Sequence, residues 1–252
     1  MVSMSDPSRD EWLKARIGDA FSQGERRPSF VGFLDEREAA VAERIARSFR
    51  REGWMFWGGY EDSERKIFGV FPDYMEPDLS YFPITAITIR FRPCDRLDHR
   101  DFLGALLGVG LQRATIGDIL PEEGRCVCFV REENAGFLLS QVEKIGRVGV
   151  RLSEGFTEPL PQGRGFSEFQ GVVASSRLDC VLAAAVGQSR EKASRLIEAG
   201  MVMKNHELVL SLSEPVQEGD KLSVRGKGRY IIDRLGPVTK KGRMGIAGRK
   251  YL

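Results

Sequence analysis

Six periodic runs between Ile84 and Leu152 restrict the fold of this chain more than any other feature of its sequence. Apolar and polar residues alternate in Ile84–Arg92, which is typical of a half-buried strand. Asp98–Leu107 instead has apolar residues at spacings of three and four, behind an aspartate that suits a helix N-cap. In order, the runs are strand 84–92, helix 98–107, strands 116–120 and 125–131, helix 134–145 and strand 148–152. This β-α-β-β-α-β order predicts a ferredoxin-like domain in a chain of the α+β class.

Many RNA-recognition modules share this topology, but a fold alone does not give a function. Such modules stack bases on several aromatic side chains of a middle strand. The corresponding strand, Arg125–Arg131, has a single aromatic residue, Phe129, which is fewer than a stacking platform needs. Cys126 and Cys128 lie two positions apart on one face of that strand, and we expect both thiols in the core rather than on a metal.

The first 80 residues predict a helix followed by a hairpin. Apolar residues recur at helical spacing in Glu36–Arg51, and Gly53 is the expected end of that helix. Trp54–Trp57 and Lys66–Phe71 then flank a pair of glycines, as paired strands do. We therefore expect an amino-terminal α+β domain, residues 1–80, ahead of the ferredoxin-like domain, residues 81–156.

A proline- and glycine-rich run, Thr157–Gly165, is the expected linker to a third domain, residues 166–252. A helix begins there at Arg177, with Ser175 or Ser176 as its cap, and ends at Gly187. A second helix, Arg190–Ala199, begins behind Ser189. After it, short strands are joined at Asn205-His206 by a two-residue turn.

The net charge of +2 conceals an uneven distribution. Residues 164–252 hold 16 basic and 9 acidic side chains, a net +7, whereas residues 1–163 have a net −5. Within residues 221–252 ten basic residues accompany one acid, Asp233. Clustered cations gain free energy by releasing counterions from phosphates, so this block favours a polyanionic partner. On charge alone, a solvated basic tail is the alternative.

The second helix of the third domain presents three cations that its core does not need. Its apolar stripe consists of Ala193, Leu196 and Ile197. Arg190 lies on one flank of this stripe, and Lys192 and Arg195 lie on the other. The tail after this helix has more charge, but its many glycines predict poor preorganisation, so that ordering it on RNA costs entropy. We expect the helix to contribute more to binding than the tail does.

A spaced pattern supports this expectation. The chain reads R-L-D-x-x-L from Arg177, S-R-x-x-A from Ser189 and L-I-x-x-G-x-V from Leu196, followed by Asn205 and Gly219-Asp220. With these elements, residues 177–229 resemble the RNA-binding domain named after the fourth ribosomal small-subunit protein. The resemblance implies a helix pair whose arginines and lysines grip structured RNA by shape and phosphate contacts.

The segments GGYEDSERK (58–66) and HRDFLGALLGVGLQRATIGDI (99–119) extend the resemblance to the whole chain, which is similar to the YlmH-type bacterial RNA-binding proteins. That resemblance implies association with the large ribosomal subunit, with ribosomal RNA and tRNA as partners, in the quality control of stalled nascent chains. The family's genes often lie near cell-division genes. A related group that accompanies photosystem preparations is an alternative.

These observations together give the candidate RNA contacts. They are Arg177, Ser189, Arg190, Lys192, Arg195, Lys204, Arg225, Lys227 and Arg229. Asp179 is interpreted as a structural partner of Arg177 or as a helix-start residue. Two interpretations stay open for Tyr60, Glu61, Glu64 and Arg65 in the glycine turn, and for Arg113 and Asp118: contact with RNA or protein, or local hydrogen bonding.

An RNA-modifying enzyme of the pseudouridine synthase type is the rival class, because such enzymes carry the same RNA-binding domain and a catalytic aspartate in R-L-D. That triplet occurs at residues 96–98 and 177–179, without the threonine and glycine that follow it in the enzymes. The two histidines, His99 and His206, form no nucleophile–base or metal pattern.

We therefore expect no catalysis, no cofactor and no bound metal. The sequence has no apolar run of about 18 residues, no secretory start and no C-x-x-C pair. It predicts a cytoplasmic protein that has no membrane or small-molecule partner.

Overall fold

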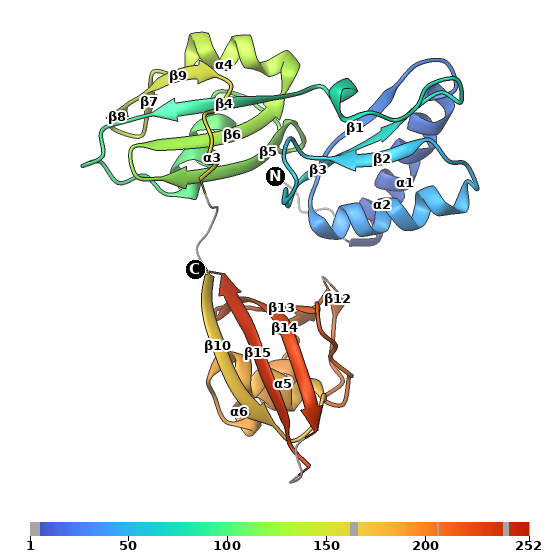
Figure 1. Ribbon diagram of the computed structural model, residues 1–252, viewed down its shortest axis with the longest axis vertical. Coiled ribbons are helices and arrows are strands. Elements are labelled where there is room, and N and C mark those ends of the chain that lie inside the picture. Colours follow the sequence, from blue (N-terminus) through green and yellow to red (C-terminus); the bar gives the residue numbers. More distant parts are fainter. Residues whose placement is uncertain (1–5, 162–165, 206, 239–241, 252) are drawn as a thin grey trace. The chain divides into compact units, whose positions relative to one another are not determined.

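The computed structural model describes residues 6–161, 166–205, 207–238 and 242–251. The chain divides into two compact units, residues 1–163 and residues 164–252 (Figure 1). Both units mix helices with antiparallel sheet, which confirms the predicted α+β class. No described helix is both long enough and apolar enough to span a membrane.

The first unit begins with a three-stranded antiparallel sheet of order β1-β3-β2. Its strands are β1 (Ser29–Leu34), β2 (Trp54–Trp57) and β3 (Lys66–Val70). Two helices, α1 (Asp6–Gln23) and α2 (Glu36–Ser48), pack on this sheet through one apolar cluster. The β2–β3 pair is the predicted hairpin, whereas α1 and β1 lie in a segment for which the sequence pattern gave no prediction.

The helix predicted over 36–51 ends earlier, at Ser48, so Gly53 does not end it. Phe49 is its C-cap and Arg50 adopts a left-handed conformation with φ of 50°. The apolar pattern of the sequence extends to Phe49 although the helix has ended. Phe49 is apolar because it packs in the tertiary structure: its ring stacks on that of Phe21, with centroids 4.3 Å apart. That contact lies beyond the end of the helix.

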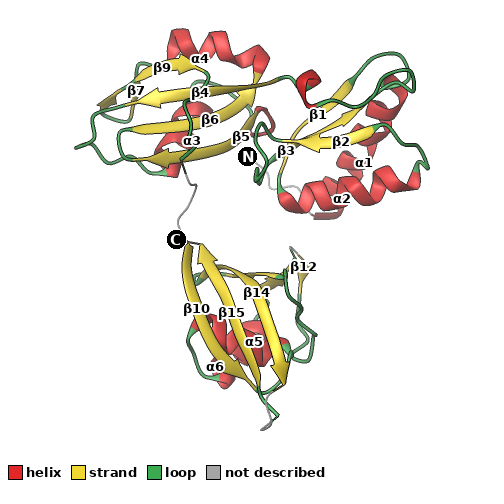
Figure 2. Ribbon diagram, viewed as in Figure 1, coloured by secondary structure: helices red, strands yellow, loops and turns green. Residues whose placement is uncertain are grey.

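A second sheet in this unit has the order β5-β6-β4-β9, with antiparallel neighbours throughout. Its strands are β4 (Ile84–Arg90), β5 (Ile116–Glu122), β6 (Arg125–Arg131) and β9 (Arg151–Glu154). Helices α3 (His99–Gly108) and α4 (Ala135–Gln141) cover one face (Figure 2). The arrangement is the predicted ferredoxin-like one, and Asp98 caps α3 as expected.

The helix predicted over 134–145 is shorter than expected. It ends at Gln141, and Lys144–Ile145 (β7) pairs with Val148–Gly149 (β8) instead. Val142 and Ile145 are nevertheless buried in the same core as α4. Their apolar spacing therefore matches that of a longer helix, although the helix ends before them. Short 3-10 turns complete the unit, at Leu79–Tyr81 (η1), Arg113–Thr115 (η2) and Glu132–Asn134 (η3).

Strand β6 separates two cores. Cys126 and Cys128 are buried, as predicted, in the core that the sheet shares with α3 and α4. Burial raises the pKa of the Cys128 thiol to about 12. Val127 and Phe129 face the other way, into a core shared with the first sheet. The part of the open face where an RNA-recognition module would stack bases is therefore partly occupied by the protein itself.

Asp118, on β5, attaches the glycine turn between β2 and β3 to the second sheet. Its buried carboxylate accepts hydrogen bonds from the Tyr60 hydroxyl at 2.8 Å and from the backbone N–H groups of Glu64 and Arg65 at 2.7 and 3.0 Å. The segments GGYEDSERK and TIGDI thus bind each other. Burial raises the pKa of Tyr60, and the charge of Asp118 raises it further.

Arginines complete this junction. Arg65 donates to the carbonyl oxygens of Phe33, Ile116 and Arg113 at 2.6, 3.0 and 3.2 Å. Burial, and then repulsion from Arg65, lower the pKa of Arg113 to about 10. For Tyr60, Arg65 and Asp118 the structure therefore gives a role in joining the two sheets, whereas the guanidinium of Arg113 donates locally, to the carbonyl oxygen of Ile116 at 2.6 Å.

The second unit is a six-stranded antiparallel sheet of order β10-β15-β14-β13-β11-β12. Helices α5 (Leu178–Val186) and α6 (Arg190–Glu198) pack on one face of it (Figure 1). The strands are β10 (Phe166–Val173), β11 (Val202–Lys204), β12 (Glu207–Leu208), β13 (Lys221–Val224), β14 (Gly228–Val238) and β15 (Met244–Tyr251). The β11–β12 hairpin is the predicted one, although His206 lies outside the described residues.

The prediction that the glycine-rich basic end is poorly preorganised is wrong for most of the length of that segment. β14 and β15 are long paired strands in the middle of the sheet, and β15 also pairs with β10. Gly248 serves this packing, because a Cβ there would lie 2.5 Å from Cζ of Phe169. Lys240 and Lys241 lie outside the described residues. Both α6 and the β14–β15 pair are therefore preorganised, and a difference in preorganisation is no longer a reason to expect α6 to contribute more to binding.

We predict that Gly117→Ala weakens the junction, because a Cβ at Gly117 would lie 2.6 Å from Cε1 of Phe33. Overpacking of this kind costs about 1–3 kcal/mol. The free energy of unfolding is measured in urea by tryptophan fluorescence, which reports on the first unit because all three tryptophans lie there. Gly104→Ala in α3 is the control: its Cβ meets nothing within 4 Å, so a change of about 0.5–1 kcal/mol in the stabilising direction is expected. Equal losses in both variants would contradict the packing argument.

Candidate nucleic-acid interface

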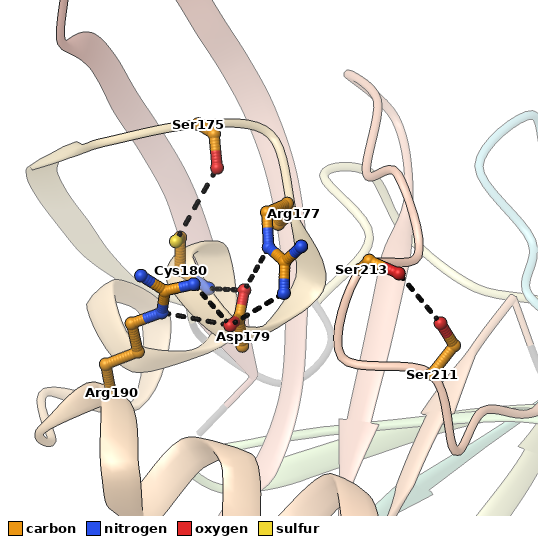
Figure 3. A network of polar contacts seen from close by, with 7 residues as sticks. All are labelled: Ser175, Arg177, Asp179, Cys180, Arg190, Ser211 and Ser213. Atoms are coloured by element: carbon orange, nitrogen blue, oxygen red, sulfur yellow. Dashed lines mark hydrogen bonds and ion pairs between the residues drawn. The ribbon is translucent and has the colours of Figure 1, made fainter.

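A buried carboxylate organises the amino-terminal ends of α5 and α6. Asp179, in the first turn of α5, has a side chain that is 3% exposed. Arg190, at the start of α6, donates to its Oδ2 from two nitrogens at 2.7 and 2.9 Å (Figure 3). Arg177, just before α5, donates to Oδ1 and Oδ2 at 3.2 and 3.3 Å. Both guanidinium groups are thereby held beside one carboxylate.

The two arginines remain accessible while they are held. The side chains of Arg177 and Arg190 are 42% and 55% exposed. A guanidinium has five N–H donors, and Asp179 uses two from each arginine. One carboxylate balances only one of the two positive charges, so the pair keeps a net positive charge with donors left for an anion.

The charge state of Asp179 follows from two opposing effects. Burial raises its pKa, but the hydrogen bonds from Arg177 and Arg190 lower it by more, and the result is a pKa below the ordinary value. The backbone N–H of Cys180 also donates to Oδ1 at 2.9 Å. The carboxylate is therefore ionised at neutral pH, and the expected pairing of Asp179 with Arg177 is present.

Helix α5 begins without the serine cap expected from the sequence. Its N-cap is Arg177, and neither Ser175 nor Ser176 makes a side-chain cap. Backbone carbonyls accept from the first amides of the helix instead. Leu178 N–H donates to the carbonyl of Glu214 at 2.8 Å, and Asp179 N–H donates to that of Leu212 at 3.2 Å. The loop between β12 and β13 thus supports the start of the helix.

Helix α6 presents the remaining cations of the cluster. Ser189 caps it as predicted, accepting from the N–H of Lys192 at 3.4 Å. Lys192 is exposed, and Arg195 forms an ion pair with Glu191 at 2.6 Å in which both side chains are 73% exposed. An exposed pair of this kind is weakly held and exchanges readily for another anion.

The other candidates occupy different places. Lys204, on β11, donates to Glu214 at 2.6 Å and to the carbonyl of Pro215 at 2.8 Å, so its ammonium anchors the β12–β13 loop. Arg225, Lys227 and Arg229 are exposed around the β13–β14 turn, and none of them takes part in the hydrogen bonds to Asp179. The structure therefore brings Arg177, Ser189, Arg190 and Lys192 together and adds Arg195 along the same helix. All nine stay predictions as RNA contacts.

Sequence reasoning missed Arg190 as a partner of Asp179 and missed Glu214 as a partner of Lys204. The R-L-D and S-R elements contain the residues of the first network, but their sequence separation gives no distance. No group of three His, Cys, Asp or Glu side chains in the described part of the chain could hold a metal ion.

Comparison with known proteins identifies these regions. The family described as "Putative RNA-binding domain in YlmH" matches residues 77–158, and the S4 domain family matches residues 176–222. The chain is 35% identical to the ribosome-associated protein quality control protein P2 of Bacillus subtilis (strain 168) over 223 residues, which cover 87% of this chain and 86% of the relative. The chain belongs to the YlmH family.

A solved structure agrees at the level of the fold. The cell division protein YlmH from Streptococcus pneumoniae is similar to 64% of this chain and is covered over 98% of its own length, with a TM-score of 0.50 and 22% identity. In this YlmH-family chain the Asp179 network and α6 lie within the S4 domain. The ferredoxin-like sheet lies within the other matched domain.

We predict that Asp179→Asn destabilises α5 and α6 by about 2–3 kcal/mol at neutral pH, because charged hydrogen bonds are lost inside the fold. The pKa of Asp179 is lowered in the folded state, so its contribution is present above the ordinary carboxyl pKa of about 3.9 and is lost as pH falls through the lowered folded value. The difference between the two proteins should thus be constant near neutral pH and should shrink in acid. Hydrogen exchange of the α5 and α6 amides measures it.

Asp233→Asn is the matched control for this prediction. Asp233 also accepts two hydrogen bonds from one arginine, Arg249, at 2.8 Å each, but its side chain is 34% exposed. A loss of no more than about 1 kcal/mol is expected for a surface pair. If both variants lost the same stability, burial of Asp179 would not be the cause.

Proposed function

We propose that this chain binds structured RNA on the ribosome, namely ribosomal RNA or tRNA at the large subunit, during quality control of stalled nascent chains. The name of its Bacillus subtilis relative supports the ribosomal setting. The observation that carries the proposal is the pair Arg177 and Arg190, fixed on Asp179 with donors facing solvent. A cytoplasmic location follows from the ribosomal setting.

The mechanism that we propose is positional. Residues 164–252 carry a net +7, which attracts a polyanion over some distance. At contact, Arg177 and Arg190 meet phosphates with little loss of side-chain entropy, since Asp179 already restricts them. Arginine can make paired hydrogen bonds to a phosphate, which lysine cannot. The helix pair then selects RNA by shape.

A non-catalytic role is part of the proposal. Asp179 is enclosed by two guanidinium groups, and Asp98 accepts hydrogen bonds from the N–H groups of Arg100 and Asp101 as the cap of α3. Both R-L-D aspartates thus have structural roles, which favours binding over the pseudouridine synthase alternative. We expect rRNA from cells with and without the protein to show the same pseudouridines by mass mapping. A site restored by the wild type but not by Asp98→Ala or Asp179→Ala would support the enzyme.

We predict that Arg190→Ala with Arg195→Ala weakens the free energy of ribosome binding, measured by co-sedimentation, by about 2–4 kcal/mol. Each charged hydrogen bond contributes roughly 1.5–3 kcal/mol, and the two contributions overlap in part. Three to six phosphate contacts would give log K a slope of about −2 to −5 against log salt in the wild type, with a shallower slope in the variant.

The matched control is Arg26→Ala with Arg27→Ala, which removes two exposed arginines from the first unit. It should leave α6-dependent binding unchanged. Circular dichroism confirms folding of each variant. If the two double variants lost the same ribosome affinity, or if ribosome binding by the wild type did not depend on salt, the proposal would be contradicted.

A further inference from the structure

The open face of the β5-β6-β4-β9 sheet, opposite α3 and α4, holds a cavity that the S4 domain does not share. It has a volume of about 220 Å³ and lies over Ile84 and Ala86 of β4 and Phe129 of β6. The remaining walls come from other elements: Trp57, Gly59, Leu79, Ser80, Phe82 and Phe156. Pockets for drug-sized ligands are usually roughly 300–1,000 Å³, so this one suits a single ring system.

The aromatic residues missing from β6 are supplied here from outside that strand. Trp57 ends β2, and Phe156 follows β9 with its ring centroid 6.0 Å from that of Phe129. Trp57 is half-buried and Phe156 is 38% exposed, so both rings can be reached from solvent. The face therefore offers several aromatic walls, although the strand itself contributes only Phe129.

Arginines lie on the same face. Arg90 of β4 stands directly opposite Arg125 of β6 and Arg151 of β9, which gives a row of three cations across neighbouring strands. Like charges in facing positions destabilise a sheet. Arg125 is engaged, since it pairs with Glu122 and donates to the carbonyls of Thr157 and Pro159 at 2.8 and 2.5 Å. Arg90 and Arg151 are exposed and have no acidic partner among the residues that the structure describes.

The cavity and the arginines fit one kind of occupant. A flat base with an apolar face suits aromatic walls, and its flanking phosphates suit exposed arginines. Arg90 is four positions after Ala86, about 13 Å along the strand, a distance that a few nucleotides can span. An apolar peptide would use the cavity but would leave the two arginines without a partner.

We infer that this face binds an unpaired RNA segment, with one base in the cavity beside Trp57 and Phe156 and with phosphates on Arg90 and Arg151. The site rests on the proposed function only in that its ligand is RNA. It binds single-stranded RNA, whereas the S4 domain is proposed to bind structured RNA, and the two are therefore tested separately.

The test uses the full chain with Arg190→Ala and Arg195→Ala, to reduce binding by α6, and a fluorescent ten-nucleotide RNA without secondary structure. Phe156→Ala should weaken binding about five- to 100-fold, the range expected when a base loses its stacking partner. Phe156→Tyr should retain most of the affinity. Arg90→Ala with Arg151→Ala should weaken binding and reduce its salt dependence.

Phe137→Ala is the matched control, because Phe137 lies on α4, over the opposite face of the sheet, and is 46% exposed. The Phe137→Ala variant should bind the ten-nucleotide RNA with the same affinity as the chain that carries only Arg190→Ala and Arg195→Ala. The same RNA carrying 4-thiouridine should crosslink on irradiation to peptides that contain Trp57 or Phe156. Crosslinks confined to other peptides, or equal losses in Phe156→Ala and Phe137→Ala, would overturn the inference. Neither result bears on ribosome binding through Arg190 and Arg195.

Discussion

Burying a carboxylate is costly unless every acceptor site is hydrogen-bonded, and each unit of this protein is arranged around one such group. Asp118 receives a hydroxyl and two backbone N–H groups from the turn between β2 and β3, and so fixes the first sheet to the second. Asp179 receives two guanidinium groups and a backbone N–H, and so fixes the start of α5 to the start of α6. In both places the groups that satisfy the carboxylate determine how neighbouring elements meet.

The two networks differ in what they leave for a ligand. Around Asp118 the donors are inside the protein, and Arg65 uses its guanidinium on backbone carbonyls of the junction. Around Asp179 the guanidinium groups extend to the surface, where their remaining donors face solvent. The same chemistry therefore gives a rigid junction in one unit and a restrained cationic surface in the other. Only the second is suited to capture a polyanion, which agrees with the charge distribution of the chain.

The first sheet also changes what the ferredoxin-like sheet can do. Its side chains and the turn at Gly59 cover part of the open face, and Phe129 stacks on Tyr60 with centroids 5.0 Å apart. An extended stacking platform is therefore not available. A smaller aromatic cavity remains at the margin of the covered region, and it combines residues from β2, β4, β6, η1 and the segment after β9. Such a site cannot be seen in any single strand.

The sequence by itself determined the elements with strong periodicity, such as β4, β6 and the Asp98-capped α3, because local spacing and caps decide these. It also determined the charge asymmetry and the motifs that indicate the family. Only the tertiary structure decided the partners of Asp118, Asp179 and Lys204, and it placed the glycine-rich basic end in β14 and β15 of a sheet. Those outcomes depend on pairing between distant segments, such as Phe166 with Tyr251, whose free energy no local pattern records. The residues of the site were visible in the sequence, but the buried carboxylate that orients them acquires its role only when α5 and α6 pack.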